Sequence, residues 1–532
     1  MSSIDWRPMG DAAVLMALPG TAVGGASGAA APKGVREVVV GLDSVLLRLE
    51  PGGDPAAAVR AFAASLDERA DGGEGSTIEV PTAFDGDDLA TVAAAAGLAA
   101  RDVVELMVRA TFEVAAIGFS PGFPYLRGLP AQLAGVGRRP TPRPVVPAGS
   151  VAVAGGMGAI YPQASPGGWQ LVGRTPLRLF DAHRAPYALF APGDRLHFVE
   201  APAGVAPDTT RAAERRIGDE GTVLVEDPGT YCTVQDAGRR GVAHLGVPDA
   251  GAADAVSLDL ANRLVGNDAT APALEATVRG PVLRFGADTF VAVVGDCGLE
   301  LDGIEARPGT AFPVRAGQRL TVGALRSGVR AYVAFAGGVL VDAWFDSAST
   351  DTLSGLGPGP VVAGQRLAVG PAAGAPGGHL VSPGPRRGRG PIELRVILGP
   401  HTEFFDADLA AQLAATALRV GEASNRVGVR LVAERPLPRR DTELRSTPMV
   451  VGAVQVPPDG QPIILGVDHA TLGGYPVAAV VVGADLALLG QCRPGEDIRL
   501  VPVSFAEARR AAAAAARQLR RAVVGRYPTE PA

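Results

Sequence analysis

The chain has 532 residues, of which 47% are hydrophobic and 20% are charged, and its formal net charge is −6 at pH 7. This length is typical of roughly three or four domains, and an acidic chain lacks the basic surface of a nucleic-acid-binding protein. No apolar run is long enough to span a membrane, and the N-terminus lacks the pattern of a signal peptide. The three cysteines lie far apart, which favours reduced thiols, so we expect a cytoplasmic protein.

Lysine is almost absent from the chain. Lys33 is the only lysine among the 49 lysine and arginine residues. A Walker P-loop requires its lysine, and biotin is attached to its carrier through a lysine, so the sequence excludes a P-loop and predicts no biotin on this chain. The six histidines show no spacing typical of metal ligands, so we also expect no metal site.

The hydrophobic periodicity predicts six segments in chain order. Residues 1–82 combine strand patterns with an amphipathic helix after Asp54, which is typical of a small α+β domain. Two helical patterns open residues 83–200, and β patterns follow them. The remaining segments are a Pro- and Ala-rich linker (201–218), a first β-rich domain of the second half with a helix over 254–266 (219–390), a second β-barrel domain (391–505), and a C-terminal helix and tail (506–532).

Two repeated patterns suggest internal duplication. LFAPGDRLHFV (189–199) matches LGQCRPGEDIRLV (489–501), since each is an apolar strand, a Pro-Gly-acid turn and a second strand. The pairs Tyr161-Pro162 and Tyr475-Pro476 occur upstream of these turns. The pattern predicts two related β-barrel domains, one per half. A shorter repeat, AGQRLTVG (316–323) and AGQRLAVG (363–370), indicates equivalent strands within one domain.

The stretch 117–174 is dense in glycine, proline and aromatic residues, a composition typical of rigid loops on which binding sites are built. Pro121 follows Ser120, so we expect a ligand hydrogen bond from Ser120 rather than a nucleophile elbow. The guanidinium groups of Arg143 and Arg174 suit bidentate binding of a carboxylate or phosphate, although each could instead pair with an acid such as Asp181. The candidate ligand-binding residues here are Ser120, Arg143, Ser150, Tyr161, Ser165 and Arg174.

Two stretches of the second half carry the other polar candidates. Within 227–267, Asp254 fits the N-cap of the predicted helix, and the remaining candidates are Gln235, Asp236, Arg239 and His244. Within 424–476 the candidates are Asn425, Arg426, Gln455, Asp468, Thr471 and Tyr475. We expect His244, Gln455 and Asp468 to act in catalysis. The residues expected to bind substrate or nucleotide are Gln235, Asp236, Asn425, Arg426, Thr471 and Tyr475. The predicted site is a groove between residues 117–174 and the second half.

These motifs resemble a known enzyme family. IGFSPGFPYLRGLP and IYPQASPGGWQLVGRTPLRLFD are similar to the B subunits of bacterial ATP-dependent 5-oxoprolinase, also called allophanate hydrolase subunit 1. GAVQVPPDGQPIILGVDHATLGGYP and the stretch 227–267 resemble the C subunits of the same enzyme. The resemblance extends from about Gly10 to about Val503 and indicates a fused B–C chain.

The resemblance implies a fold and an activity. The implied fold is mixed α+β and β-rich, with two cyclophilin-like β-barrel domains, one per half, and a small N-terminal α+β domain. The implied activity is that of an ATP-dependent cyclic amide hydrolase, a component of 5-oxoprolinase, which opens 5-oxo-L-proline to L-glutamate. ATP with Mg²⁺ would be a substrate, and a separate A subunit would be the partner. Without a P-loop lysine, arginine and Mg²⁺ would neutralise the phosphate charge.

Departures from the family pattern leave alternatives open. Met107 stands where the family has a histidine, and Asp346 and Ala348 replace a glycine and an arginine of a Gly-Ser-Arg-Ser-Thr motif. The same domains resemble the carboxyltransferase component of a biotin-dependent, urea-carboxylase-like enzyme, whose biotin would come from another chain. The B-like half also resembles a non-enzymatic inhibitor of a histidine kinase. A homo-oligomer is compatible with each alternative.

Overall fold

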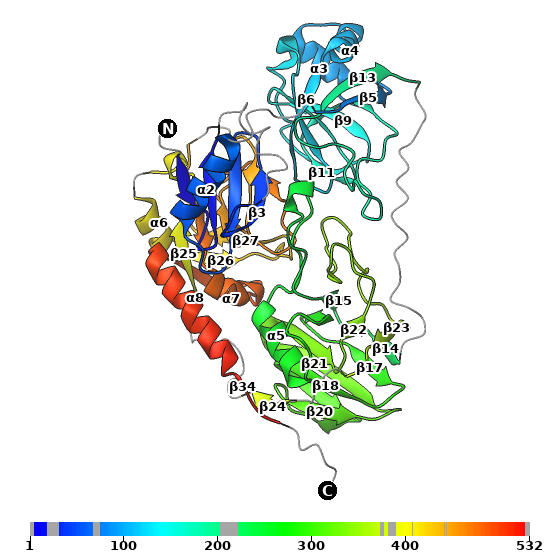
Figure 1. Cartoon of the computed structure of the whole chain (residues 1–532), viewed down its shortest axis with the longest axis vertical. Coiled ribbons are helices and arrows are strands. Elements are labelled where there is room, and N and C mark those ends of the chain that lie inside the picture. The colour runs from blue at the N-terminus through cyan, green and yellow to red at the C-terminus, as the bar shows by residue number, and fades with distance from the viewer. Residues whose placement is uncertain are drawn as a thin grey trace.

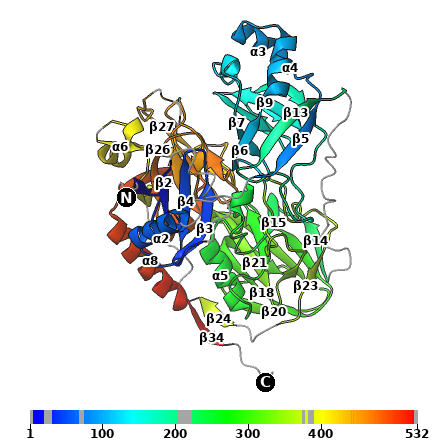
Figure 2. The same cartoon turned by 45° about the horizontal axis from the view of Figure 1, so that its top comes forward.

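The computed structural model describes residues 5–18, 31–67, 75–202, 222–372, 377–380, 390–406, 408–440, 442 and 444–526. These residues form an N-terminal domain, a first barrel, a central sheet domain and a second barrel with a C-terminal helix (Figure 1). The N-terminal domain lies against the second barrel, and the first barrel lies beside the loops of the sheet domain in both views (Figure 2). Within the described ranges, no helix is long and apolar enough to cross a membrane.

The N-terminal domain is a four-stranded sheet that is covered on both faces. Successive side chains of a strand point to opposite faces. Val14 and Met16 therefore pack with helix α2 (Pro55–Asp67), whereas Ala13 and Leu15 pack on the second barrel. The strand order is β1 (Trp6–Pro8), β2 (Ala13–Ala17), β4 (Ser44–Leu49) and β3 (Val35–Val40). The expected small α+β domain is present.

The first barrel is a seven-stranded sheet whose two edges are joined. Its order is β12 (Gln170–Arg174), β9 (Ser150–Ala154), β10 (Met157–Ile160), β7 (Pro124–Arg127), β6 (Phe112–Ile117), β13 (Arg195–Glu200) and β5 (Thr77–Thr82). Reciprocal backbone hydrogen bonds of 2.9 and 2.8 Å between Ala83 and Arg174 connect the edges. Because β5 pairs with β13, this domain begins at Thr77, and the boundary expected at residue 82 falls one strand too late.

The remaining elements of the first barrel lie around this sheet. Helices α3 (Leu89–Ala96) and α4 (Ala100–Arg109) pack on one side of it through Val92, Val103 and Met107. A separate ladder joins β8 (Arg143–Val146) to β11 (Ser165–Gly167). Both strands of this ladder come from the glycine- and proline-rich stretch, which therefore contains ordered strands as well as loops.

The second barrel is closed and has the topology of the first. Its order is β25 (Ile392–Leu398), β32 (Val477–Val481), β29 (Ala453–Gln455), β30 (Ile463–Leu465), β27 (Gly428–Ala433), β26 (Leu418–Val420) and β33 (Asp497–Pro502). Counted from β5, the first barrel follows the same order, and each barrel has its one parallel pair at the same place, β13–β5 and β33–β25. The prediction of two barrels, one per half, is confirmed.

The Pro-Gly-acid turns occupy equivalent positions in the two barrels. Gly193 and Gly495 have φ values of +96° and +87°, a region that favours glycine. Their N–H groups donate to Val114 and Val420, each at 2.8 Å. The Tyr-Pro pairs are not equivalent, because Tyr161 directly follows β10 whereas the other tyrosine precedes β32. One of the two sequence signals for duplication was therefore coincidental.

The central sheet domain is a ten-stranded β-structure with one helix. Asp254 caps helix α5 (Ala255–Leu264) by accepting a 2.9 Å hydrogen bond from Ser257 N, as predicted. The repeated AGQR segments begin β21 and β23, which flank the paired central strands β17 and β14. The strands are β14 (Val223–Asp227), β15 (Tyr231–Gln235), β16 (Ala273–Thr277), β17 (Val282–Phe285), β18 (Thr289–Leu301), β19 (Ile304–Glu305), β20 (Ala311–Val314), β21 (Arg319–Phe335), β22 (Val339–Leu340) and β23 (Arg366–Val369).

The C-terminal helix docks on the second barrel. Helix α8 (Phe505–Arg520) starts with a capping box between Ser504 and Glu507, and Ala508 is buried in a cluster with Ile397 and Val482. Beyond it, β34 (Val523–Arg526) pairs with β24 (Gly377–Leu380). The predicted linker, residues 201–218, lies outside the described residues except at its first two positions.

Candidate functional site at the junction of the domains

The glycine-rich loop of the first barrel docks directly on the second barrel. Leu472, on β31 (Leu472–Gly473), packs in an aromatic cluster of the first barrel with Tyr125 and Trp169. A Cβ atom on Gly118 would overlap the Leu472 side chain, so this contact requires glycine. The Tyr125 hydroxyl also hydrogen-bonds to Ser446. The two halves meet through the predicted stretches, although these particular contacts close the surface rather than form a groove.

A buried ion network joins the second barrel to the sheet domain. The guanidinium of Arg426 holds Asp468 with two hydrogen bonds of 2.9 and 2.8 Å, contacts Glu275 at 2.6 Å and donates to the Gly251 carbonyl at 2.6 Å. Side chains of all three charged residues are at most 5% exposed. A buried charge is stable only when it is paired and hydrogen-bonded, and Arg426 is fully engaged in this way. It therefore connects the two domains, and its role as a substrate ligand stays a prediction.

Glu275 lies at the sheet-domain end of this network. It accepts hydrogen bonds from Tyr332 at 2.7 Å and from Arg330 at 3.2 Å. Burial raises the pKa of Glu275, but the charges of Arg426 and Arg330 outweigh burial and hold that pKa below its ordinary value. Glu275 therefore stays ionised and anchors the arginines of both domains.

Asp351 is the titratable group of the junction. It is 1% exposed, and burial together with the negative charge of Asp468 raises its pKa to about 7. Thr352, the next residue along the chain, connects Asp351 to Asp468. Its N–H and its hydroxyl group donate to the Asp468 carboxylate at 3.0 and 2.6 Å. Asp351 itself accepts from Leu353 N at 3.0 Å and from the Ser354 hydroxyl. A carboxyl group with this pKa can accept or release a proton near neutral pH.

Arg239 lies beside Asp351 with unused hydrogen-bond donors. It is completely buried, and its Nη2 donates to the Ser349 carbonyl. Its Nε and Nη1 atoms have no hydrogen-bond partner in the part of the chain that the structure describes. A buried guanidinium with two unpaired N–H groups is suited to an anionic or carbonyl oxygen. Arg239 and Asp351 thus bring a charge-stabilising donor and a titratable acid into one site.

Asp236 organises the loop that carries these groups. It accepts hydrogen bonds from Ser347 Oγ at 2.7 Å, from Ala348 N at 2.7 Å and from Ser349. Asp346 has φ +58°, a left-handed conformation that glycine adopts without strain, which fits the glycine that the family resemblance implies at this position. Asp236 therefore holds the loop in place, and its role as a substrate ligand stays a prediction.

Other buried polar atoms near the junction lack partners among the described residues. They are Ser120 Oγ, Ser165 Oγ, Gln235 Oε1, Thr471 Oγ1 and His469 Nε2. Buried hydroxyl and amide groups are normally hydrogen-bonded, so these atoms are suited to contact a ligand. Ser120, Ser165, Gln235 and Thr471 were predicted as binding residues, and their placement is compatible with that role. Burial lowers the pKa of His469, which is therefore neutral at physiological pH.

The two predicted anion-binding arginines are paired with acids. Arg143 makes two 2.8 Å hydrogen bonds to Asp88, whose side chain is 4% exposed. Arg174 is half exposed and pairs with Asp85 at 3.0 Å. Both arginines therefore form ion pairs within the protein, which is the second of the two alternatives. Their partners are Asp88 and Asp85 rather than Asp181. The planar fork of each arginine is used within the first barrel.

The remaining predicted residues are dispersed around the junction. His244 is exposed on a short 3₁₀ turn (Ala243–Leu245), and Asn425 holds a turn by accepting from Val427 N at 2.9 Å. Gln455 is buried and its amide lies 3.4 Å from the Tyr475 carbonyl. Ser150 and Tyr161 are buried in the first barrel, whereas Tyr475 is 38% exposed. Among the described residues, no hydrogen bond or ion pair joins His244, Gln455 and Asp468 to one another, and their catalytic role stays a prediction.

The described residues contain no group of three or more His, Cys, Asp or Glu side chains that could hold a metal ion. Met107, which replaces an expected histidine, lies on α4 and is completely buried in the core of the first barrel. Its substitution therefore removes no side chain from the junction. Asp351 was not singled out from sequence, because no local motif distinguishes it and its pKa comes from contacts across the fold. Arg239 was noted among the polar candidates, but its two unpaired donors depend on the fold and could not be predicted.

Comparison with known proteins places the two halves in one family. Carboxyltransferase domain subdomains C and D match residues 6–190, and subdomains A and B match residues 245–502. The chain belongs to the carboxyltransferase-domain family. Its two matched segments correspond to the two predicted halves, so the fusion inferred from sequence is confirmed.

Relatives of this family match each half separately. The C subunit of 5-oxoprolinase from Escherichia coli is 38% identical over 289 residues, covering 53% of this chain and 92% of the relative. The B subunit of 5-oxoprolinase from E. coli O157:H7 is 48% identical over 135 residues, covering 25% of this chain and 62% of the relative. Urea amidolyase of Saccharomyces cerevisiae is 33% identical over 308 residues, which span 53% of this chain but only 17% of that protein.

A solved structure matches nearly the whole chain. The crystal structure of TTHA0988 superposes with a TM-score of 0.82 at 35% sequence identity, covering 92% of this chain and all of that one. The two-barrel carboxyltransferase architecture is therefore shared over the full described fold.

Proposed function

We propose that this chain supplies the B and C components of an ATP-dependent 5-oxoprolinase and acts with a separate A subunit. The observation that carries the proposal is the pair of relatives: one chain contains a counterpart to 92% of a 5-oxoprolinase C subunit and, separately, a segment 48% identical to a B subunit. The proposed reaction consumes 5-oxo-L-proline, ATP and two water molecules and gives L-glutamate, ADP and phosphate.

The chemistry of a lactam explains the use of ATP. In the proposed first step the lactam carbonyl oxygen attacks the γ-phosphorus and ADP leaves, which makes the ring carbon susceptible to water. When water has added and the C–N bond breaks, the ring nitrogen must take a proton. The product of this step is γ-glutamyl phosphate, which the second water hydrolyses to L-glutamate and phosphate. We assign charge stabilisation at the activated oxygen to Arg239 and delivery of that proton to Asp351, whose pKa of about 7 leaves it partly protonated at neutral pH.

The nucleotide would bring its own metal. Mg²⁺ commonly binds through substrate phosphates and water with one or two carboxylates, so the lack of a three-ligand cluster in the described ranges is compatible with Mg²⁺–ATP as a substrate. Because Arg239 and Asp351 are buried, the proposal requires the loop at 347–357 to open for substrate.

The proposal is tested by measuring glutamate formed from 5-oxo-L-proline and ATP by the purified chain, with and without a separate A subunit. Glutamate that forms only when chain, A subunit and ATP are all present supports it. No glutamate in the complete mixture contradicts it.

A second function is favoured by the family match itself. Both matched segments are carboxyltransferase subdomains, and a urea amidolyase is 33% identical to this chain. In this alternative the chain transfers a carboxyl group from biotin on another protein to urea. Carboxyl transfer from a carboxylated biotin carrier to urea, measured with labelled bicarbonate, would support the alternative.

A further inference from the structure

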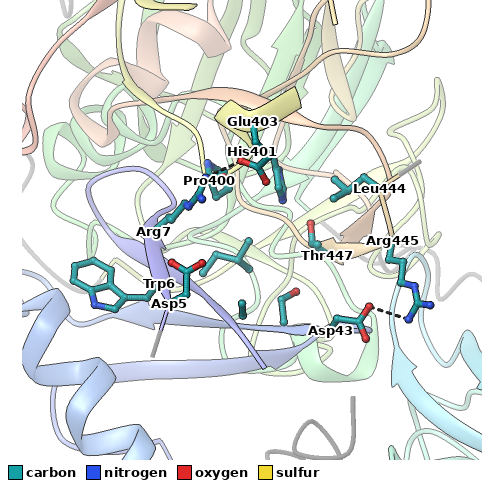
Figure 3. A pocket seen from close by; sticks show the side chains of 13 residues that line it. Asp5, Trp6, Arg7, Asp43, Pro400, His401, Glu403, Leu444, Arg445 and Thr447 are labelled. Atoms are coloured by element: carbon teal, nitrogen blue, oxygen red, sulfur yellow. Dashed lines mark hydrogen bonds and ion pairs between the residues drawn. The ribbon is translucent and has the colours of Figure 1, made fainter. Parts of the chain in front are cut away.

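A pocket of about 300 Å³ opens between the N-terminal domain and the second barrel (Figure 3). It shares no residue with the Arg239–Asp351 site. One wall comes from the segment matched by subdomains C and D, and the other from the segment matched by subdomains A and B. Its polar lining consists of Asp5, Arg7, Asp43, Ser44, His401, Glu403, Arg445 and Thr447.

His401 offers this pocket one fixed hydrogen-bond donor. Its ring is 5% exposed, and its Nδ1 atom accepts a 3.1 Å hydrogen bond from Val477 N. A nitrogen that accepts from an N–H group carries no proton, so the neutral ring carries its proton on Nε2. Burial lowers the pKa of His401 to about 4, which keeps the ring neutral at physiological pH. The second barrel thus presents an uncharged N–H donor.

Ion pairs engage every charged group of the pocket lining except one carboxylate. Arg7 contacts Glu403 at 2.7 Å, and Asp43 contacts both Arg445 at 3.0 Å and Arg127, which is not a lining residue, at 3.4 Å. Asp5 makes no ion pair with any residue that the structure describes, and Figure 3 shows its carboxylate on the side of the pocket opposite His401. Asp5 is therefore the one carboxylate of the pocket lining without an ion pair among the described residues, and the His401 donor lies across from it.

We propose that this pocket binds a free α-amino acid. The ammonium group of such a ligand matches the carboxylate of Asp5, and its carboxylate matches the N–H of His401 and the half-exposed guanidinium of Arg7. Leu15, Ala17 and Leu444 provide an apolar surface for the side chain. A volume near 300 Å³ is at the small end of ligand pockets and suits a molecule of this size.

The test is calorimetric titration of the full chain with each of the twenty common amino acids. n-Propylamine, propionate and an N-acetyl amino acid serve as probes that lack one of the two charged groups. We expect at least one α-amino acid to bind, and the three probes to bind about 10-fold more weakly or not at all. If no amino acid binds, or if a probe binds as tightly as the amino acid, the proposal is wrong.

Two variants locate the binding site. Asp5→Asn removes the carboxylate charge, and His401→Asn retains an acceptor for Val477 N but removes the Nε2 donor. Each should raise the Kd of the amino acid about 10-fold. Asp296→Asn, a matched change at a 51% exposed aspartate of the sheet domain, should leave it unchanged. Unfolding temperatures without ligand verify that the variants fold. If the amino acid binds both folded variants as tightly as it binds the parent chain, its binding site is not this pocket and the proposal is wrong.

Discussion

Replacing Asp351 with asparagine should stabilise the protein above neutral pH and not below it. Folding raises the pKa of Asp351 from its reference value of 3.8 to about 7. Between about pH 4 and pH 7 the native state therefore binds a proton that the unfolded chain has released. The free energy of unfolding therefore falls as the pH rises from about 4 to about 7, because the native state must give up this proton. Above the folded pKa the decrease is complete.

The magnitude follows from the shift of about three pKa units, which corresponds to about 4 kcal/mol. Asparagine keeps an acceptor for Leu353 N but is a poorer partner for Ser354, at a cost of about 1 kcal/mol. The variant should therefore gain about 2–3 kcal/mol at pH 8 and lose about 1 kcal/mol at pH 4. For a domain of this size the gain corresponds to an increase in unfolding temperature of about 4–10 °C.

Scanning calorimetry of the parent chain and Asp351→Asn at pH 4, 6 and 8 measures this difference, with Asp296→Asn as the exposed control. A variant that is less stable than the parent at pH 8, or a difference independent of pH, would refute the argument. The same variant tests catalysis. If Asp351 delivers the proton to the ring nitrogen, kcat should fall about 100-fold or more, since general acid catalysis contributes this much.

Three further substitutions separate structural from functional residues. Arg174→Lys should change the free energy of unfolding by less than about 1 kcal/mol and leave activity unchanged, because the ion pair of Arg174 with Asp85 is exposed. A large loss of substrate affinity would instead support the predicted role of Arg174 in binding. Arg426→Met should destabilise the fold by about 3–5 kcal/mol in urea unfolding, because it leaves Asp468 buried without an ion pair and Glu275 with Arg330 alone; a stable variant would contradict the buried network. Gly118→Val should loosen the contact between the barrels and so speed hydrogen exchange at this contact. Adding Leu472→Ala to the same chain should make room for the valine and restore slow exchange. Unchanged exchange in the single variant would disprove the contact.

The fold was largely predictable because its signals are local. The Pro-Gly-acid turns repeat, and the positive φ values of Gly193 and Gly495 explain why both copies need glycine. The short apolar runs of β2 and β4 similarly predicted strands of the N-terminal domain. The boundary at residue 82 failed because β5 is defined by its pairing with the distant β13, which no local pattern contains.

The candidate site was predictable only in part. Asp468 and Thr471 could be placed near the meeting point of the halves, since both lie in glycine-rich loops of a recognisable motif. The roles of Arg143 and Arg426 could not be predicted, because a free arginine and one paired with a buried acid look the same in sequence. The pKa of Asp351 likewise depends on the charge of Asp468, which becomes its neighbour only in the folded chain.

The central claim is most directly tested by offering one preparation both proposed reactions. The chain is mixed with an A subunit, ATP and 5-oxo-L-proline, and in parallel with a carboxylated biotin carrier and urea, and the glutamate, ADP and carboxylated urea are measured. The account predicts glutamate and ADP in a one-to-one ratio and no carboxyl transfer. Carboxylated urea without ATP-dependent glutamate would contradict it.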